Sequence, residues 1–189
     1  MDLFEAIRSR RTIYKFEDRA VPDDALSRAL EAACWAPNHK RTEPWRFVVV
    51  GPETRARLGA VAARLAVAKA GDVPDDERAR QVQRATAKLT DLPCLVVMTT
   101  VKNPGDPLRE KEDYAACACA AQNLQLSLWA EGIGCQWGTG GPTRDDESYD
   151  ILGIDRSTEE IIGFFKVGYP KDVPSIDRRP HSEVTKHLP

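Results

Sequence analysis

Apolar and polar positions along the chain predict helices first and then strands that are separated by helices. Over residues 2–10 the apolar residues recur at the spacing of one helix face, which is typical of a short amphipathic helix. Asp23 is a candidate N-cap for a second helix, and this helix must end before Pro37 because a residue that precedes proline disfavours helical geometry.

Runs of β-branched residues bounded by glycine or proline predict the strands, and longer periodic stretches predict further helices. The predicted strands cover residues 47–50, 94–101, 134–138 and 161–168, and the further helices cover residues 53–70, 76–89 and 113–131, with Thr143 as the cap of one more helix before the last strand. Gly132 follows the longest helix where a left-handed cap is needed. Residues 115–121 are small on every face of that helix, so we expect it in the middle of the fold or at a subunit contact. The order of elements indicates an α+β fold instead of a doubly wound nucleotide-binding fold.

Composition narrows the class of protein. The chain has 189 residues, of which 42% are hydrophobic and 30% charged, as is typical of one soluble domain. Its formal net charge of −2 gives no overall attraction to nucleic acid or to an anionic membrane. No segment approaches the roughly 18 apolar residues of a membrane span, and the acidic N-terminus is unlike a signal peptide, so we expect a cytoplasmic protein. The five cysteines show neither a disulfide framework nor zinc-ligand spacing, and we expect core thiols and no metal site.

Two arginine clusters could bind an anion. Arg10, Arg11 and Thr12 follow the first helix, and a turn there can direct guanidinium groups and a hydroxyl at a phosphate. The alternative is a solvated basic helix end that complements the helix dipole. Arg178 and Arg179 form a second cluster in the tail, for which the alternative is a solvated charged segment.

Two further segments could contact a planar ligand. Between Trp35 and Phe47, two prolines bracket a polar loop that contains His39, which can donate to an anion or to a heteroaromatic ring; ordinary surface is the alternative, and Trp45 fits a core anchor better than a ligand. Residues 131–142 contain five glycines, which let backbone amides approach a ring without interference from Cβ. Their spacing is neither the dinucleotide fingerprint nor a P-loop.

Taken in order, these segments resemble the nitroreductase family, in particular its short single-domain members. The family's opening Arg-Arg-Ser/Thr turn and its later aromatic correspond to Arg10-Arg11-Thr12 and Phe16, and its Ala-Pro block corresponds to residues 36–47. The helix that ends in Glu131-Gly132-Ile133-Gly134, the turn at residues 137–140 and the segment at residues 163–170 match the later blocks. The matches span nearly the whole chain in the right order.

The resemblance implies an α+β, three-layer sandwich with a central, mostly antiparallel sheet flanked by helices, in an intertwined homodimer with FMN at the interface. Residues 1–189 would form one FMN-binding domain, whose tail from about residue 170 to 189 wraps the partner subunit. The implied cofactor-binding residues are Arg10, Arg11 and Thr12 at the phosphate and ring edge, Trp35 and His39 from the opposite subunit, Gln136, Trp137 and Gly138 along the flavin, and Arg179, or its neighbour Arg178, at the phosphate.

The chain departs from the family pattern at three positions. Tyr14 stands where many members carry arginine, and Arg41 and Glu43 stand where longer members carry asparagine and glutamine. A cation and an acid at the last two positions would change the electrostatic field over the flavin, and with it the range of acceptors.

The resemblance further implies an NAD(P)H-dependent oxidoreductase that passes electrons through FMN to nitroaromatics, quinones or similar small molecules by a ping-pong mechanism. No catalytic side chain is required, because the cofactor carries the chemistry. One alternative is a specialised flavin enzyme of the same fold, of the reductive dehalogenase or flavin-cleaving type, or a flavin-binding protein without general reductase activity. A nucleic-acid-binding module built on the arginine clusters is a further alternative, which a steep salt dependence of binding would reveal.

Overall fold

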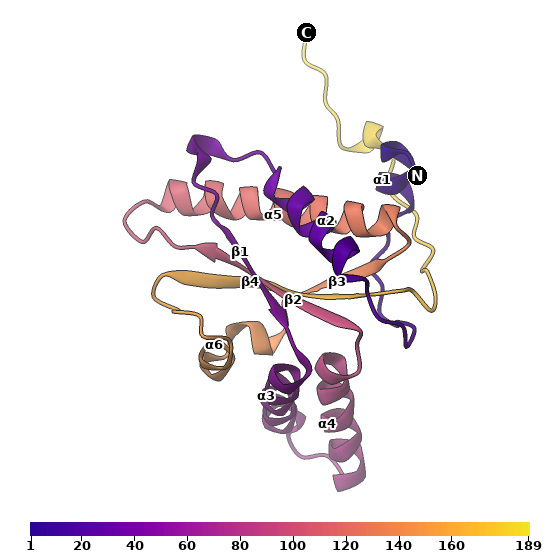
Figure 1. Cartoon of the computed structure of the whole chain (residues 1–189), viewed down its shortest axis with the longest axis vertical. Coiled ribbons are helices and arrows are strands. Elements are labelled where there is room, and N and C mark those ends of the chain that lie inside the picture. Colours follow the sequence, from indigo (N-terminus) through magenta and orange to yellow (C-terminus); the bar gives the residue numbers. More distant parts are fainter.

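The computed structural model describes residues 1–189 as a sheet between two layers of helices (Figure 1). The helices are α1 (Leu3–Ser9), α2 (Asp23–Cys34), α3 (Pro52–Ala70), α4 (Asp75–Thr90), α5 (Pro107–Ala130) and α6 (Asp146–Leu152). The strands are β1 (Trp45–Val50), β2 (Cys94–Val101), β3 (Gly134–Gly138) and β4 (Glu159–Gly168), and short 3-10 turns lie at η1 (His39–Arg41), η2 (Gly141–Arg144) and η3 (His181–Glu183). The predicted α+β class is confirmed.

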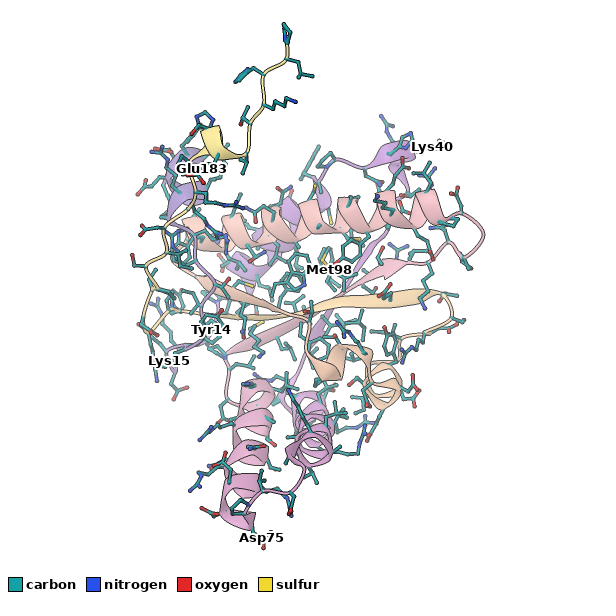
Figure 2. The ribbon with its side chains drawn as sticks, turned by 180° about the vertical axis from the view of Figure 1, so that it is seen from behind. Tyr14, Lys15, Lys40, Asp75, Met98 and Glu183 are labelled. Carbon is teal, nitrogen blue, oxygen red and sulfur yellow. The ribbon has the colours of Figure 1, made fainter.

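The four strands form one sheet in the order β1-β2-β4-β3, and every pair is antiparallel. Leu95, Val96, Val97 and Met98 of the central strand β2 are all fully buried. A strand is apolar on both faces only when both faces are covered, and this accounts for the continuous apolar run from which the strand was predicted. Met98 lies in the middle of the molecule in Figure 2.

Two apolar clusters fill the spaces on either side of the sheet. On one face α2 and α5 pack over the sheet through alanines, leucines and Cys117, together with Trp45, Met98 and Phe165. On the other face Leu58 and Ala62 of α3, Leu89 of α4 and Tyr149 of α6 pack against β2 and β4. Figure 1 shows the same division, with α2 and α5 on one side and the α3–α4 pair with α6 on the other. Ala116, Cys117, Ala120 and Ala121 of α5 therefore lie in the core, as in one of the two expected arrangements, whereas Ala115 and Cys119 are exposed.

The segment after α1 runs along the free edge of β3. Thr12 forms a parallel bridge with Cys135, and the amide of Ile13 donates to the Cys135 carbonyl at 3.1 Å. Ile13 is fully buried, and a Cβ added at Gly134 would lie only 2.4 Å from its Cγ1. Glycine at position 134 thus permits the close approach that fixes Arg10, Arg11 and Thr12 beside β3.

Three details of the predicted elements were wrong. The longest helix begins at Pro107 instead of Asp113, because Asp106 caps it by accepting the amide of Arg109 at 3.0 Å. Asp23 is the first helical residue, and Pro22 occupies the N-cap without a side-chain hydrogen bond. Thr143 lies in η2 and donates to the carbonyl of Gly140 at 2.8 Å, whereas Asp145 caps α6.

The predicted geometry of Gly132 is confirmed, whereas the predicted burial of the cysteines is confirmed only in part. Gly132 has the expected positive φ, at 77°. Of the five cysteines, Cys117 and Cys135 are buried and Cys94 is half-buried, but Cys34 and Cys119 are exposed, so the expectation of core thiols holds for only part of the set. None of the helices combines the length and the apolar character needed to cross a bilayer.

Candidate functional site

Two neighbouring cavities lie on the α3–α4 side of the sheet, next to β3 and β4. The first, of about 330 Å³, is enclosed by α3, α4 and the turn that follows β3, and glycines 138, 140 and 141 form part of its wall. The second, of about 580 Å³, lies between Tyr14, Gln136 and the C-terminal end of α4. Lys88 and Lys166 line both cavities, which together are called the cationic groove below.

Strand alternation decides which side chains face this groove. In β3, Gln136 and Gly138 point to the groove, whereas Cys135 and Trp137 pack with the core on the α5 side. The Trp137 ring stacks on Phe165 with centroids 5.4 Å apart, and its indole N–H donates to the Ile162 carbonyl at 2.9 Å. The Trp137 side chain is therefore part of the core, and only its backbone remains for a ligand in the groove.

The groove concentrates positive charge. Its cations are Lys15, Lys69, Arg84, Lys88, Lys166 and Lys171, and Asp91 is the one acid in its lining. None of these six cations takes part in a salt bridge. Burial lowers the pKa of Lys166, and the neighbouring Lys88 lowers it further. Lys166 is half-buried while the other five cations are exposed, and an anion bound beside Lys166 would supply the Coulomb partner that it lacks.

Arg10, Arg11 and Thr12 lie beside β3 and bring more positive charge to this region. Burial lowers the pKa of Arg10, and the neighbouring cations Arg178 and Arg11 lower it further against an opposing effect of Cys135. The Nε atom of Arg11 is buried without a hydrogen-bond partner, while its Nη1 donates to the carbonyls of Arg8 and Arg10. A buried donor without a partner is unusual in a native structure and indicates a missing acceptor.

The predicted site residues fall into two groups. Arg10, Arg11, Thr12, Gln136 and Gly138 come together along β3, and Arg178 of the tail lies near Arg10. Trp35 and His39 lie instead at the end of α2 and in η1, which pack with α5 on the other face of the sheet. Figure 2 shows Lys40, next to His39, at the far side of the molecule from Tyr14. One subunit alone does not bring the two groups together.

The second group is exposed. Trp35 is 81% exposed, an unusual fraction for so large an apolar side chain. His39 is also exposed, and its Nδ1 lies 2.8 Å from Oε2 of Glu112 on α5. Arg179 belongs to the exposed tail, whose last residues, after η3, run away from the helical layers in Figure 1. These side chains are positioned by their own subunit yet point to its surface.

The sequence reading missed the lysines of the groove. Lys166 gave a usable signal, because it interrupts an otherwise apolar strand between Phe165 and Val167, both fully buried. Lys88 gave none, since a lysine in the last turn of a helix is common for reasons of helix dipole alone.

Comparison with known proteins places this geometry in a family. The sequence profile described as "Nitroreductase family" matches residues 7–169. The chain belongs to the nitroreductase family. Among curated nitroreductases, it is 33% identical to the Bacillus subtilis (strain 168) protein named "Putative NAD(P)H nitroreductase YfhC" over 178 residues, which is 94% of this chain and 89% of that protein. It is 31% identical to the Escherichia coli (strain K12) protein of the same description, YdjA, over 90% of each chain.

Solved nitroreductase structures agree with the fold. A nitroreductase-like family protein from Bacillus cereus superposes with a TM-score of 0.83 at 30% identity, covering 100% of this chain and 96% of that one. A nitroreductase-type protein from Desulfovibrio desulfuricans, solved in complex with FMN, superposes with a TM-score of 0.75 at 24% identity over 98% of this chain and 96% of its own. Family membership makes the chain an oxidoreductase of the nitroreductase type.

Proposed function

We propose that this nitroreductase binds FMN in the cationic groove and passes electrons from NAD(P)H to small acceptors such as nitroaromatics or quinones. The observation that carries the proposal is the unpaired positive charge around Lys88 and Lys166, next to a glycine-lined wall. FMN has a doubly charged phosphate and a flat ring. Arg10 and Arg11, beside β3, offer cations to the phosphate, and the glycines of the groove offer bare backbone to the ring.

The residues fit this cofactor at three points. Arg10, Arg11 and Thr12 would hold the phosphate, and the buried Nε of Arg11 would gain the acceptor it lacks. Gln136 and Gly138 would line the ring with side chain and backbone, and Trp137 with backbone alone. Of the tail arginines, Arg178 has the better support at the phosphate, because its charge acts on Arg10; the assignment of Arg179 remains a prediction from the resemblance.

When bound, FMN supplies the hydride and electron transfer. The chain's own residues bind, orient and provide electrostatic stabilisation. Lys88 and Lys166 would stabilise negative charge that develops on the reduced cofactor, and the walls of α3 and α4 would keep water from one side of the ring. NAD(P)H and the acceptor would occupy the same open side in turn, which gives ping-pong kinetics.

The proposed active unit is a homodimer. Trp35 and His39 would reach the flavin held by the partner subunit, which explains why they are exposed and lie away from their own groove. Residues 1–189 would act as a single domain, and the tail from about residue 170 to 189 would wrap the partner. In support of the latter, residues 177–189 are exposed throughout.

Spectroscopy of the purified protein tests the proposal. We expect the absorption of bound flavin, bleaching on anaerobic titration with NADH or NADPH, and recovery of the colour when a nitroaromatic is added. Arg10→Ala should lose FMN and remain a dimer. Colourless protein that takes up no FMN from solution would contradict the proposal.

A second candidate is a specialised flavin enzyme of the same fold. An iodotyrosine deiodinase solved with FMN and 3-iodo-L-tyrosine shares the fold, with a TM-score of 0.74 at 21% identity over 95% of each chain. The charged positions Arg41 and Glu43 favour an acceptor that carries charges of its own, as an amino acid does. Recovery of the bleached colour by 3-iodo-L-tyrosine but not by nitroaromatics would favour this candidate over a general reductase.

A further inference from the structure

The loop between α2 and β1 is held in an unfavourable backbone conformation. Lys40, Arg41 and Glu43 have φ values of 57°, 53° and 45°, and none of them is glycine. Left-handed geometry costs a residue with a Cβ of order 1 kcal/mol or more, so it persists only where surrounding contacts impose it. Three such residues within one short loop indicate that something holds this loop firmly.

The contacts that hold the loop come from the first turns of α5. Asp113 is only 1% exposed. Its Oδ1 accepts the hydroxyl of Thr42 at 2.5 Å, and its Oδ2 accepts the side-chain amide of Asn103 at 2.9 Å. No lysine, arginine or histidine forms a salt bridge with it. A buried carboxylate without a cation is costly, and these hydrogen bonds are what satisfy it.

The hydrogen bonds continue from Asp113 into the loop. The Asn38 side-chain amide donates to the Thr42 hydroxyl at 3.0 Å, and its Oδ1 accepts the Glu43 amide at 2.7 Å. The Thr42 hydroxyl therefore accepts from Asn38 while it donates to Asp113, and hydrogen bonds in such a chain strengthen one another.

A second set of contacts fixes His39. Its Nδ1 lies 2.8 Å from Glu112 Oε2, and its carbonyl accepts from Arg109 at 3.2 Å. Arg109 and Glu112 stand on α5 beside Asp113, so one rigid helix end holds the loop at two places.

The exposed members of the loop, His39, Lys40 and Arg41, have no target in their own subunit's groove, since Lys40 lies on the far side of the molecule from Tyr14 (Figure 2). We propose that Asp113 is a positioning residue that, through Thr42, sets the loop of one subunit over the flavin bound by the other. The proposal rests on the proposed function, because it needs a shared flavin site. The proposal adds to that function a buried side chain, Asp113, which contacts neither the flavin nor the acceptor. It fixes the position of the loop that contacts them.

Single variants give the first test. In Asp113→Asn the carboxylate becomes an amide that cannot accept both hydrogen bonds, and Thr42→Val removes the hydroxyl at nearly constant shape. We expect each to raise the acceptor KM, or to weaken FMN binding, by roughly tenfold to a hundredfold, as for the loss of a hydrogen bond to a charged group. The visible circular dichroism of the bound flavin should change as well. Lys111→Gln, an exposed change in the same turn of α5, is the matched control.

Subunit mixing gives the decisive test, with two affinity tags used to isolate heterodimers. An Arg10→Ala subunit has a defective phosphate site and an intact loop, and an Asp113→Asn subunit has the reverse. If the loop acts on the partner's flavin, their heterodimer holds one site with both parts intact. It should then bind the flavin that the Arg10→Ala homodimer loses and recover the acceptor KM and FMN affinity that are impaired in the Asp113→Asn homodimer.

The remaining outcomes distinguish failure of the Asp113 proposal from failure of the other assignments. No gain in the heterodimer would show that the loop acts within its own subunit and would overturn the proposal. An Asp113→Asn homodimer with unchanged KM, FMN affinity and flavin spectrum would overturn it too. An Arg10→Ala homodimer that binds FMN normally would instead contradict the assignment of Arg10 to the phosphate, whereas wild-type protein that takes up no FMN would contradict the proposed function itself.

Discussion

Lys166 is the residue at which stability and binding oppose each other. It lies between two fully buried neighbours in β4, beside Lys88 and without an acidic partner. Burial and Lys88 both lower its pKa from the ordinary value of 10.5, so the charged form is disfavoured in the folded protein. A bound anion would reverse that disadvantage.

Replacing Lys166 with methionine should stabilise the FMN-free protein and weaken FMN binding. Below the lowered pKa of the folded state, Lys166 is protonated in both the folded and the unfolded protein. Folding then carries the full free-energy cost of burying its charge. As pH rises through that value towards 10.5, the folded state releases its proton first and the penalty fades. The Tm advantage of Lys166→Met over wild type should therefore be greatest near neutral pH and shrink towards pH 10.5. Calorimetry of the FMN-free proteins across this range checks it, with the exposed change Lys111→Met as the control.

Arg41 should influence which acceptors are preferred. It is exposed and held in left-handed geometry in the loop that we place over the partner's flavin. Arg41→Gln should raise KM for an anionic nitroaromatic, such as a nitrobenzoate, by about two- to fivefold, the worth of an exposed ion pair. A neutral nitroaromatic serves as the internal control. Equal effects on both acceptors would mean that the Arg41 charge does not act on the substrate.

At the scale of elements, α5 connects the core to the candidate site. Its middle and later turns pack against α2 and the sheet, and its first turns hold the loop of residues 38–43. The early turns depend on the Asp106 cap, which accepts the Arg109 amide.

Asp106→Ala should lower the free energy of unfolding by about 1 kcal/mol, as for other lost N-caps. It should also perturb the bound flavin's spectrum, because Arg109, Glu112 and Asp113 follow within the first turns. Urea unfolding and visible circular dichroism measure the two effects. Asp106→Asn, which retains an accepting oxygen, should preserve both properties, and failure of that rescue would exclude the cap as the cause.

Substitution of Gly163 tests how tightly the Trp137 ring packs against β4. A Cβ there would lie 2.1 Å from the indole nitrogen of Trp137, so Gly163→Ala must displace that ring and break its hydrogen bond to Ile162. We expect a loss of about 1–3 kcal/mol, as for other overpacked cores. Gly105→Ala, where an added Cβ meets nothing within 4 Å, is the matched control in denaturant unfolding.

Most elements could be predicted because their signals are local. The strand at β2 and the end of α5 at Gly132 followed from apolar runs and glycine geometry. The start of α5 could not be found by periodicity, because residues 109–113 are charged and carry no apolar face; the pair Asp106-Pro107 was the better signal. Strand order also lay beyond the sequence, since β3 pairs with β4 across an intervening helix.

At the scale of the whole molecule, the candidate site has two parts, one at the edge of the sheet beside β3 and one beside the first turns of α5. The sequence reading identified members of both, Arg10 and His39, because each stands in a recognisable motif. It could not identify the groove lysines, whose proximity depends on how α4 packs against β4. Whether the two parts meet depends on the proposed dimer, which the heterodimer experiment tests.

Removal of the tail should separate folding from assembly. Residues 177–189 are exposed throughout and add nothing to the three apolar clusters. A chain that ends at residue 175 should therefore fold with nearly unchanged far-ultraviolet circular dichroism but dimerise and hold FMN more weakly. Sedimentation and flavin titration measure these effects. Equal dimer affinity with and without the tail would contradict the proposed wrapping.

The backbone pairing of residues 12–16 with residues 135–171 has a consequence for biosynthesis. Thr12 bridges Cys135, Phe16 bridges Pro170, and the Lys171 amide donates to the Lys15 carbonyl at 3.0 Å. Residues 10–16, which include the arginines proposed to bind the phosphate, thus leave the ribosome long before residues 135–171, with which this segment pairs, have emerged. Flavin capture would then be a late, post-translational event, and a truncated nascent chain would carry the arginines without the ability to use them.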